Sequence, residues 1–201
     1  MDPAEALRAF DALGRAAFAA AQGLVRLQVS RGATGGPRLV GTARATGRES
    51  AAWTALLAPF PHEGPGPWGG AKLTGHPRVA FARAAAAAAG CDEALLFDAE
   101  GRLVEGARTS LLVVRGDGEL VAPPLARGGV LGVAREIVAE AEGGLAEADL
   151  RLEDLFRARE IVALNAVRGA VAIVRLAGRP VGAAAPGPTA ARLRAVIACA
   201  E

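Results

Sequence analysis

The stretch that decides the fold is Asp92–Leu125, which reads DEALLFDAEGRLVEGARTSLLVVRGDGELVAPPL. It contains four short apolar runs, EALLF, RLVEG, TSLLVVR and ELVAPP, and two of the junctions between them are the glycine turns AEG at 99–101 and GDG at 116–118. Apolar runs of this length, bounded by glycine turns, are typical of β-strands joined as hairpins. The stretch therefore predicts a dense β region in the middle of the chain.

Helices and further strands flank this region. The segment HPRVAFARAAAAAAG predicts a helix that ends at Gly90, and a glycine loop at 128–132 leads into a second helix, VAREIVAEAEG. Strands are predicted over LAEADLRL, REIVALNA and GAVAIVRLAG, with a helical turn at EDLFRA, and PTAARLRAVIACAE predicts a closing helix. Because strands and helices mix without strict alternation, we expect an α+β fold with a mixed or mostly antiparallel sheet.

The first 62 residues predict a small N-terminal domain that is separate from the β-rich region. Asp2 and Pro3 suit the start of a helix that Gly23 ends, and a strand follows from Leu24. The segment RGATGGPRLVG indicates a turn or loop, and AAWTALLAPF favours a strand over a short helix. Three prolines and four glycines in PHEGPGPWGG, residues 61–70, are typical of a linker. We therefore predict an N-terminal portion at 1–62, a linker at 63–71 and a main domain at 72–201.

Composition excludes several classes of function. The 201 residues carry 23 basic and 21 acidic side chains, for a net charge of +2, and the scattered arginines with few aromatic residues give no support for nucleic-acid binding. No apolar run approaches the roughly 20 residues of a membrane span, and the N-terminus lacks the pattern of a signal peptide. Cys91 and Cys199 are isolated, and His62 and His76 lack metal-ligand spacing, so we expect a cytoplasmic protein with reduced thiols and no metal site.

Lys72 is the only lysine in the chain, so 22 of the 23 basic residues are arginine. A coding bias against lysine and asparagine explains why both are scarce, but it does not explain where the last ones lie. Lysine differs from arginine because it forms Schiff bases and its pKa is readily lowered. Lys72 is therefore either a reactive amine or an ordinary surface charge. The same argument applies to Asn165, the only asparagine.

Several segments occur together in a distinctive order. They are DEALLFD from Asp92, the VEGA segment at 104–107, the pair PP at 123–124, the segment GVLGVAR at 129–135 and the late LNA at 164–166. In this order the chain resembles the fold-type IV pyridoxal-phosphate enzymes, the class IV aminotransferases and their relatives, over about residues 70–200. The resemblance implies a D-amino-acid aminotransferase-like α+β fold, a shortened N-terminal small domain, a small-molecule amino substrate and a homodimer.

The resemblance also implies a cofactor, pyridoxal 5′-phosphate, and residues that hold it. Lys72 falls where the family has its Schiff-base lysine, which also moves a proton, and Glu105 falls where the family has the carboxylate that faces the ring nitrogen. The implied phosphate contacts lie at the start of the helix after the glycine loop and at the end of a late strand: Gly132, Val133, Ala134, Asn165 and Ala166. Candidates for contacting the substrate are Arg108, Thr109 and Arg168, each of which is otherwise an ordinary surface or turn residue.

The late LNAVRGA and the segment GVA at 132–134 favour one reaction within the family. They lack the hydroxyl residues that the family's aminotransferases usually carry there, and they look more like 4-amino-4-deoxychorismate lyase. That enzyme forms 4-aminobenzoate and pyruvate for folate synthesis. Two alternatives remain open: a class IV transaminase of D- or branched-chain amino acids, and a degenerate, non-catalytic member of the family.

Overall fold

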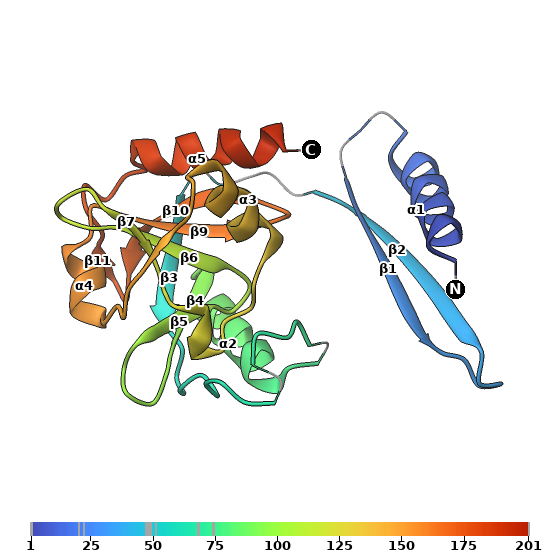
Figure 1. Ribbon diagram of the computed structural model, residues 1–201, viewed down its shortest axis with the longest axis horizontal. Helices are drawn as coiled ribbons and strands as arrows, with labels where there is room; N and C mark the ends of the chain where they lie inside the picture. The colour runs from blue at the N-terminus through green and yellow to red at the C-terminus, as the bar shows by residue number, and fades with distance from the viewer. Residues whose placement is uncertain are drawn as a thin grey trace. The chain divides into compact units, whose positions relative to one another are not determined.

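The computed structural model describes residues 2–19, 21, 23–46, 50, 52–67, 69–73 and 75–200. The chain divides into two compact units, Met1–Glu49 and Ser50–Glu201, and Figure 1 shows both. We describe each unit by itself.

The first unit is one helix with a two-stranded hairpin. Helix α1 spans Pro3–Phe18, and the Ala4 N–H donates to the Asp2 carboxylate at 3.0 Å, so the predicted cap is present. Strands β1 (Gly23–Arg31) and β2 (Pro37–Ala45) pair antiparallel along their whole length. The turn predicted from residue 31 is therefore short, and the residues after it form a strand that pairing with β1 stabilises. No side chain of these three elements is fully buried among the described residues.

The second unit is built on one large sheet. Its strands are β3 (Ala52–Leu57), β4 (Glu93–Phe97), β5 (Leu103–Gly106), β6 (Ser110–Val114), β7 (Leu120–Ala122), β8 (Ala146–Glu147), β9 (Glu160–Asn165), β10 (Gly169–Leu176) and β11 (Arg179–Pro180). The strand order is β5-β4-β3-β10-β9-β6-β7-β8, with β11 on β10. Strand β3 lies parallel to β4 and β10, β7 lies parallel to β8, and the other pairs are antiparallel. The predicted mixed sheet is confirmed, although LAEADLRL contributes only the two residues of β8.

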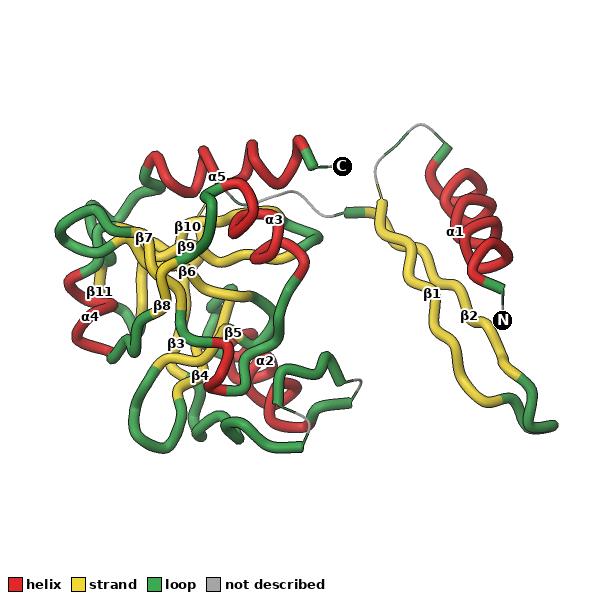
Figure 2. Tube along the Cα trace, viewed as in Figure 1, coloured by secondary structure: helices red, strands yellow, loops and turns green. Residues whose placement is uncertain are grey.

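Helices cover this sheet (Figure 2). They are α2 (Pro77–Ala88), α3 (Val133–Ala141), α4 (Leu152–Arg157) and α5 (Pro188–Cys199), with a 3-10 turn at Leu125–Arg127. Strand β9 shows how the layers form, because successive side chains of a strand point to opposite faces. Ile161 and Ala163 pack into one core with α4, whereas Val162 and Leu164 pack into another under α3 and α5. A third cluster holds α2 against β4. No helix in the described part of the chain is long and apolar enough to cross a membrane.

The structure divides the chain at a different place from the sequence prediction. Strand β3 belongs to the large sheet, so the units separate between Glu49 and Ser50 and not at 63–71. The expected linker lies within the second unit. There the Gly70 N–H donates to the Gly128 carbonyl at 3.0 Å, and the His62 N–H donates to the Phe97 carbonyl at 2.6 Å. The glycines that indicated flexibility instead allow two loops to pack closely.

We expect Gly128→Ala to unfold more easily than the wild type and to disturb the loop before Lys72. Gly128 has φ +95°, and an added Cβ would lie 2.5 Å from the Gly64 carbonyl oxygen. The backbone strain alone costs roughly 1–3 kcal/mol, and the clash adds to it. The free energy of unfolding in urea measures the loss. Gly118→Ala is the matched control, since Gly118 has φ +98° but its added Cβ meets only a side-chain end, at 3.8 Å. Equal losses in the two variants would contradict the proposed packing of the loops.

Candidate active site

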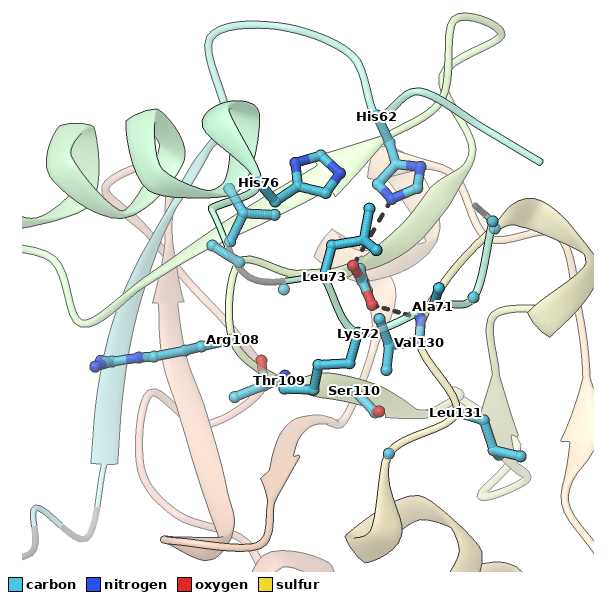
Figure 3. A pocket seen from close by; sticks show the side chains of 18 of the residues that line it. His62, Ala71, Lys72, Leu73, His76, Arg108, Thr109, Ser110, Val130 and Leu131 are labelled. Atoms are coloured by element: carbon cyan, nitrogen blue, oxygen red, sulfur yellow. Dashed lines mark hydrogen bonds and ion pairs between the residues drawn. The ribbon is translucent and has the colours of Figure 1, made fainter. Parts of the chain in front are cut away.

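A cavity of about 600 Å³ opens in the second unit (Figure 3). It lies where β5 ends, β6 begins, α3 begins and β9 ends. Ser110 pairs with Leu164 across two antiparallel strands, so the start of β6 lies beside the end of β9. Most of the residues predicted from the sequence line this cavity: Lys72, Glu105, Arg108, Thr109, Gly132, Val133, Ala134, Asn165 and Ala166. Arg168 is not among the lining residues.

Lys72 lines the cavity with an amine that has no partner among the residues that the structure describes. It is exposed, and it makes no hydrogen bond or ion pair with the residues that the structure describes. Two residues before it, the Gly70 N–H donates to the Gly128 carbonyl. An unpaired primary amine at the wall of a cavity can attack a carbonyl carbon of a bound molecule. The position therefore suits the nucleophile that the sequence predicts.

Glu105 supplies a buried carboxylate to the same cavity. The residue is 9% exposed, and its Oε2 accepts a hydrogen bond from the Val130 N–H at 2.8 Å. Its Oε1 lies 3.7 Å from Nε2 of His62, whose side chain is 7% exposed. Strand β5 fixes the backbone, because Glu105 pairs with Leu96 of β4. Two of the carboxylate's acceptor sites thus face the protein, which leaves acceptor capacity for a donor in the cavity.

The start of α3 is suited to bind an anion. Gly132 caps the helix without a side-chain hydrogen bond, and its carbonyl accepts from the Arg135 and Glu136 N–H groups. Among the described residues, no hydrogen bond uses the N–H of Val133 or Ala134. Two backbone donors at the positive end of a helix therefore face the cavity. The hydroxyl of Ser110 lies beside them, since a Cβ on Gly132 would be 3.1 Å from Ser110 Oγ.

Arg135, the last residue of the segment at 129–135, has a structural role at the start of α3. Its guanidinium is buried and donates to the Pro123 carbonyl at 3.0 Å and to the Glu147 carboxylate at 2.7 Å. These bonds tie the first turn of α3 to the end of β7 and to β8. The side chain thereby fixes the helix start that carries the two open backbone donors.

The Asn165 side chain is hydrogen-bonded within its own turn. Its Oδ1 accepts hydrogen bonds from the N–H of Val167 at 3.0 Å and of Arg168 at 2.7 Å, which closes the turn between β9 and β10. This is the turn-forming role of asparagine. Ala166, which is exposed and lines the cavity, brings the backbone of the same turn to the site.

Arg108 and Thr109 line the cavity, and their side chains also have partners within the protein. The Thr109 hydroxyl donates to Oε2 of Glu93 at 2.9 Å. The Arg108 guanidinium lies 5.1 Å from the centre of the Trp53 ring, donates to the Asp92 carbonyl, and extends away from Lys72 (Figure 3). Both side chains hold the turn between β5 and β6. Because both residues also line the cavity, contact with a substrate stays a prediction for each.

The sequence analysis missed two residues, Glu93 and His62. Glu93 is 1% exposed and holds both the Ala94 N–H and the Thr109 hydroxyl. Its signal was an acidic residue at the start of the apolar strand EALLF. His62 has no metal-ligand spacing, and no local sequence pattern predicts that it lies beside Glu105, which is distant in the sequence.

We expect Glu93→Gln to change how stability depends on pH. Burial raises the pKa of Glu93 from its usual 4.5, although hydrogen bonds from Ala94 and Thr109 and the charge of Arg108 oppose the rise. The folded protein therefore holds this proton more tightly than the unfolded chain, and the resulting stability is lost as pH rises above 4.5 through the folded-state value. The wild type should accordingly lose stability relative to Glu93→Gln over that range.

Urea unfolding of both proteins at pH values on either side of 4.5 measures this difference. Glu140→Gln, which removes an exposed glutamate on α3, is the control and should follow the wild-type curve. Parallel curves for the wild type and Glu93→Gln would show that the buried carboxyl does not titrate differently in the folded state.

The fold and the cavity together define a class of protein: an α+β enzyme domain with a free lysine, a buried carboxylate and an anion-binding helix start around one cavity. The chain belongs to the family "Amino-transferase class IV", whose model matches residues 5–176. The match begins within α1, so the family likeness extends further towards the N-terminus than the 70–200 expected from the sequence. The predicted fold-type IV enzyme is confirmed.

Solved structures of this family superimpose closely on the chain. The T.th. branched-chain amino acid aminotransferase, complexed with N-(5′-phosphopyridoxyl)-L-glutamate, is 25% identical with a TM-score of 0.82, and the match covers 98% of this chain and 70% of that one. The corresponding enzyme of Escherichia coli is 20% identical with a TM-score of 0.80, covering 96% and 69%. A "Putative 4-amino-4-deoxychorismate lyase" of Legionella pneumophila is 17% identical with a TM-score of 0.76, covering 90% and 70%. No curated protein matches the sequence significantly.

Proposed function

We propose that the cavity binds pyridoxal 5′-phosphate covalently through Lys72 and that the enzyme acts on a primary amine. The observation that carries this proposal is that one cavity contains a lysine amine with no partner in the described part of the chain, and a buried carboxylate, Glu105. A volume of about 600 Å³ lies within the usual range of ligand pockets, roughly 300–1,000 Å³. The T.th. enzyme, which also forms a structure with pyridoxamine 5′-phosphate, supports the choice of cofactor.

Each wall of the cavity suits one part of that cofactor. Glu105 would face the ring nitrogen and keep it protonated, and the bound cofactor would supply an electron sink for the substrate's bonds. The N–H groups of Val133 and Ala134, with the turn at Ala166, would bind the phosphate. Ala134 and Ala166 offer no hydroxyl, and each missing hydrogen bond to a charged group costs roughly 1.5–3 kcal/mol of affinity.

For the reaction, we propose the lyase that converts 4-amino-4-deoxychorismate into 4-aminobenzoate and pyruvate. The support is the set of residues without hydroxyls at 134 and 166 and the resemblance of the late LNA segment to that enzyme. Once the substrate amine has displaced it, Lys72 would remove the proton from the amine-bearing carbon and return it to the departing enolpyruvyl group, which is released as pyruvate. Departure of the enolpyruvyl group then leaves an aromatic ring, which makes the elimination strongly downhill.

A transaminase of branched-chain or D-amino acids is the second candidate. The T.th. branched-chain enzyme supports it, because it combines 25% identity with a TM-score of 0.82 over 98% of this chain. Transamination would use Lys72 and Glu105 in the same roles, but it needs a second substrate to take up the amino group. The two reactions therefore differ in products and in the need for an acceptor.

Product analysis separates the candidates. Protein loaded with pyridoxal phosphate is incubated with 4-amino-4-deoxychorismate alone, or with an amino acid and 2-oxoglutarate. Release of 4-aminobenzoate and pyruvate without an acceptor would support the lyase. Transfer of an amino group to 2-oxoglutarate, with no 4-aminobenzoate, would support the transaminase and contradict the lyase. Neither product from loaded protein would indicate a non-catalytic member of the family.

We also propose that the enzyme is a cytoplasmic homodimer, as the resemblance implies. The exposed apolar side chains of the first unit support an interface, because a hairpin with one helix is marginally stable by itself. Examples are Leu7, Phe10, Val29 and Val40, which are 38–65% exposed. Sedimentation equilibrium should give twice the 20.3 kDa chain mass, and a monomer mass at micromolar concentration would contradict the proposal.

A further inference from the structure

His62 is a buried imidazole in the cavity wall that the proposed chemistry does not use. Its side chain is 7% exposed, and its Nε2 lies 3.7 Å from Oε1 of Glu105. The other carboxylate oxygen accepts from the Val130 N–H at 2.8 Å. Figure 3 shows His62 and Val130 joined by dashed lines to opposite ends of one carboxylate. The two partners together fix both the position and the rotation of that group.

The hydrogen bonds of His62 determine which ring nitrogen carries the proton. The Gly64 N–H donates to Nδ1 at 2.9 Å, and a nitrogen that accepts a hydrogen bond holds no proton. The neutral ring therefore carries its proton on Nε2, the nitrogen that faces Glu105. A proton on Nδ1 would point at the Gly64 N–H, so that two donors would face each other without an acceptor. The backbone fixes the ring as well, since the His62 N–H donates to the Phe97 carbonyl at 2.6 Å.

Other charged groups near His62 have partners of their own. Glu63, the adjacent acid, lies 3.2 Å from Arg78 and 3.7 Å from His76. Glu105 is thus the acid that faces the His62 ring among the described residues. The His62 ring lies against one oxygen of this carboxylate and the Val130 N–H donates to the other, so the two contacts restrict how the carboxylate can turn.

We propose that His62 is a positioning residue, whose ring lies against the Glu105 carboxylate and keeps it turned towards the ring nitrogen of the cofactor. The proposal rests on the proposed function, since it concerns the same cavity. His62 itself would not touch the reacting atoms. Its effect would pass through Glu105: a carboxylate fixed beside the ring nitrogen keeps that nitrogen protonated to higher pH.

Two substitutions divide the contacts of His62 between them. In His62→Asn, the amide oxygen replaces Nδ1 as acceptor for the Gly64 N–H, and the contact with Glu105 is lost. In His62→Gln, the amide nitrogen takes the place of Nε2 beside Glu105, and the acceptor for Gly64 is lost. His76→Asn is the matched control, since His76 also lines the cavity but pairs with Glu63.

The test uses each protein loaded with pyridoxal phosphate that carries ¹⁵N in the ring, whose chemical shift reports protonation of that nitrogen. We expect the nitrogen to lose its proton at a pH about one unit lower in His62→Asn, a tenfold change in its proton affinity. His62→Gln and His76→Asn should titrate like the wild type. An unchanged titration in folded His62→Asn, or an equal shift in both His62 variants, would overturn the proposal.

A second measurement does not depend on how the His62 variants fold. In ¹⁵N-histidine-labelled protein, His62 should show the neutral form protonated at Nε2, and its Nε2 resonance should move in Glu105→Gln while its Nδ1 resonance stays. A proton on Nδ1 would contradict the proposal. Failure of the wild type to bind pyridoxal phosphate would instead contradict the proposed function, so the two failures are distinguishable.

Discussion

Replacing Lys72 by alanine is expected to abolish covalent attachment of pyridoxal phosphate and to lower turnover by at least roughly 10²–10⁴-fold. The amine is both the cofactor's attachment point and the proposed base, and general acid–base catalysis alone contributes a factor of that size. No other lysine can replace it, because Lys72 is the only one in the chain. The loss of activity is measured as kcat/KM for the substrate identified by product analysis.

The fold should survive this change. Lys72 is exposed and has no partner among the described residues, so the free energy of unfolding should stay within about 0.5 kcal/mol of the wild-type value. Lys72→Arg is the matched control, because it keeps the positive charge but cannot form the covalent link. Activity of Lys72→Arg close to the wild-type value would show that charge is sufficient, and it would contradict the proposed nucleophile.

Glu105→Gln is expected to have the second largest effect. The amide keeps nearly the same shape but carries no charge to pair with a protonated ring nitrogen. Losing one partner of a buried charge pair costs roughly 2–5 kcal/mol, which should appear as a lower kcat/KM and weaker cofactor binding. The covalent link at Lys72 should still form in this variant, since the amine is unchanged.

Glu105→Asp separates charge from position. It keeps the carboxylate but withdraws it by one methylene from the Val130 N–H and from His62. Activity between those of the wild type and Glu105→Gln would indicate that both charge and position matter. Wild-type activity in Glu105→Gln would show that the carboxylate does not act on the cofactor.

The sequence predicted the parts of the fold whose signals are local. The runs EALLF and TSLLVVR become buried strands, and Gly90 follows α2 as expected. The site was predicted by the order of segments along the chain. Lys72, Glu105 and the start of α3 line one cavity although Val133 lies 61 positions after Lys72 in the sequence. Their roles in binding the cofactor stay predictions.

Contacts between distant segments explain most of what could not be predicted. In the sequence, the glycines of 61–70 indicate flexibility. In the structure, Gly64 and Gly70 pack against Gly128, a contact that no local pattern predicts. The contacts of Arg108 with Trp53 and Asp92, and of Thr109 with Glu93, join segments that are not adjacent in the sequence. Contact of either residue with a substrate stays a prediction. Strand β2 depends on pairing with β1, because its own apolar pattern is weak.

Borohydride reduction followed by mass spectrometry tests the central claim most directly. Protein incubated with pyridoxal phosphate is reduced, digested and mapped, so that a covalently held cofactor becomes a stable phosphopyridoxyl group on one amine. The account predicts that this group lies on Lys72 in the wild type and is absent from Lys72→Ala. A wild-type protein that carries no such group, or carries it only on the N-terminal amine, would contradict the account.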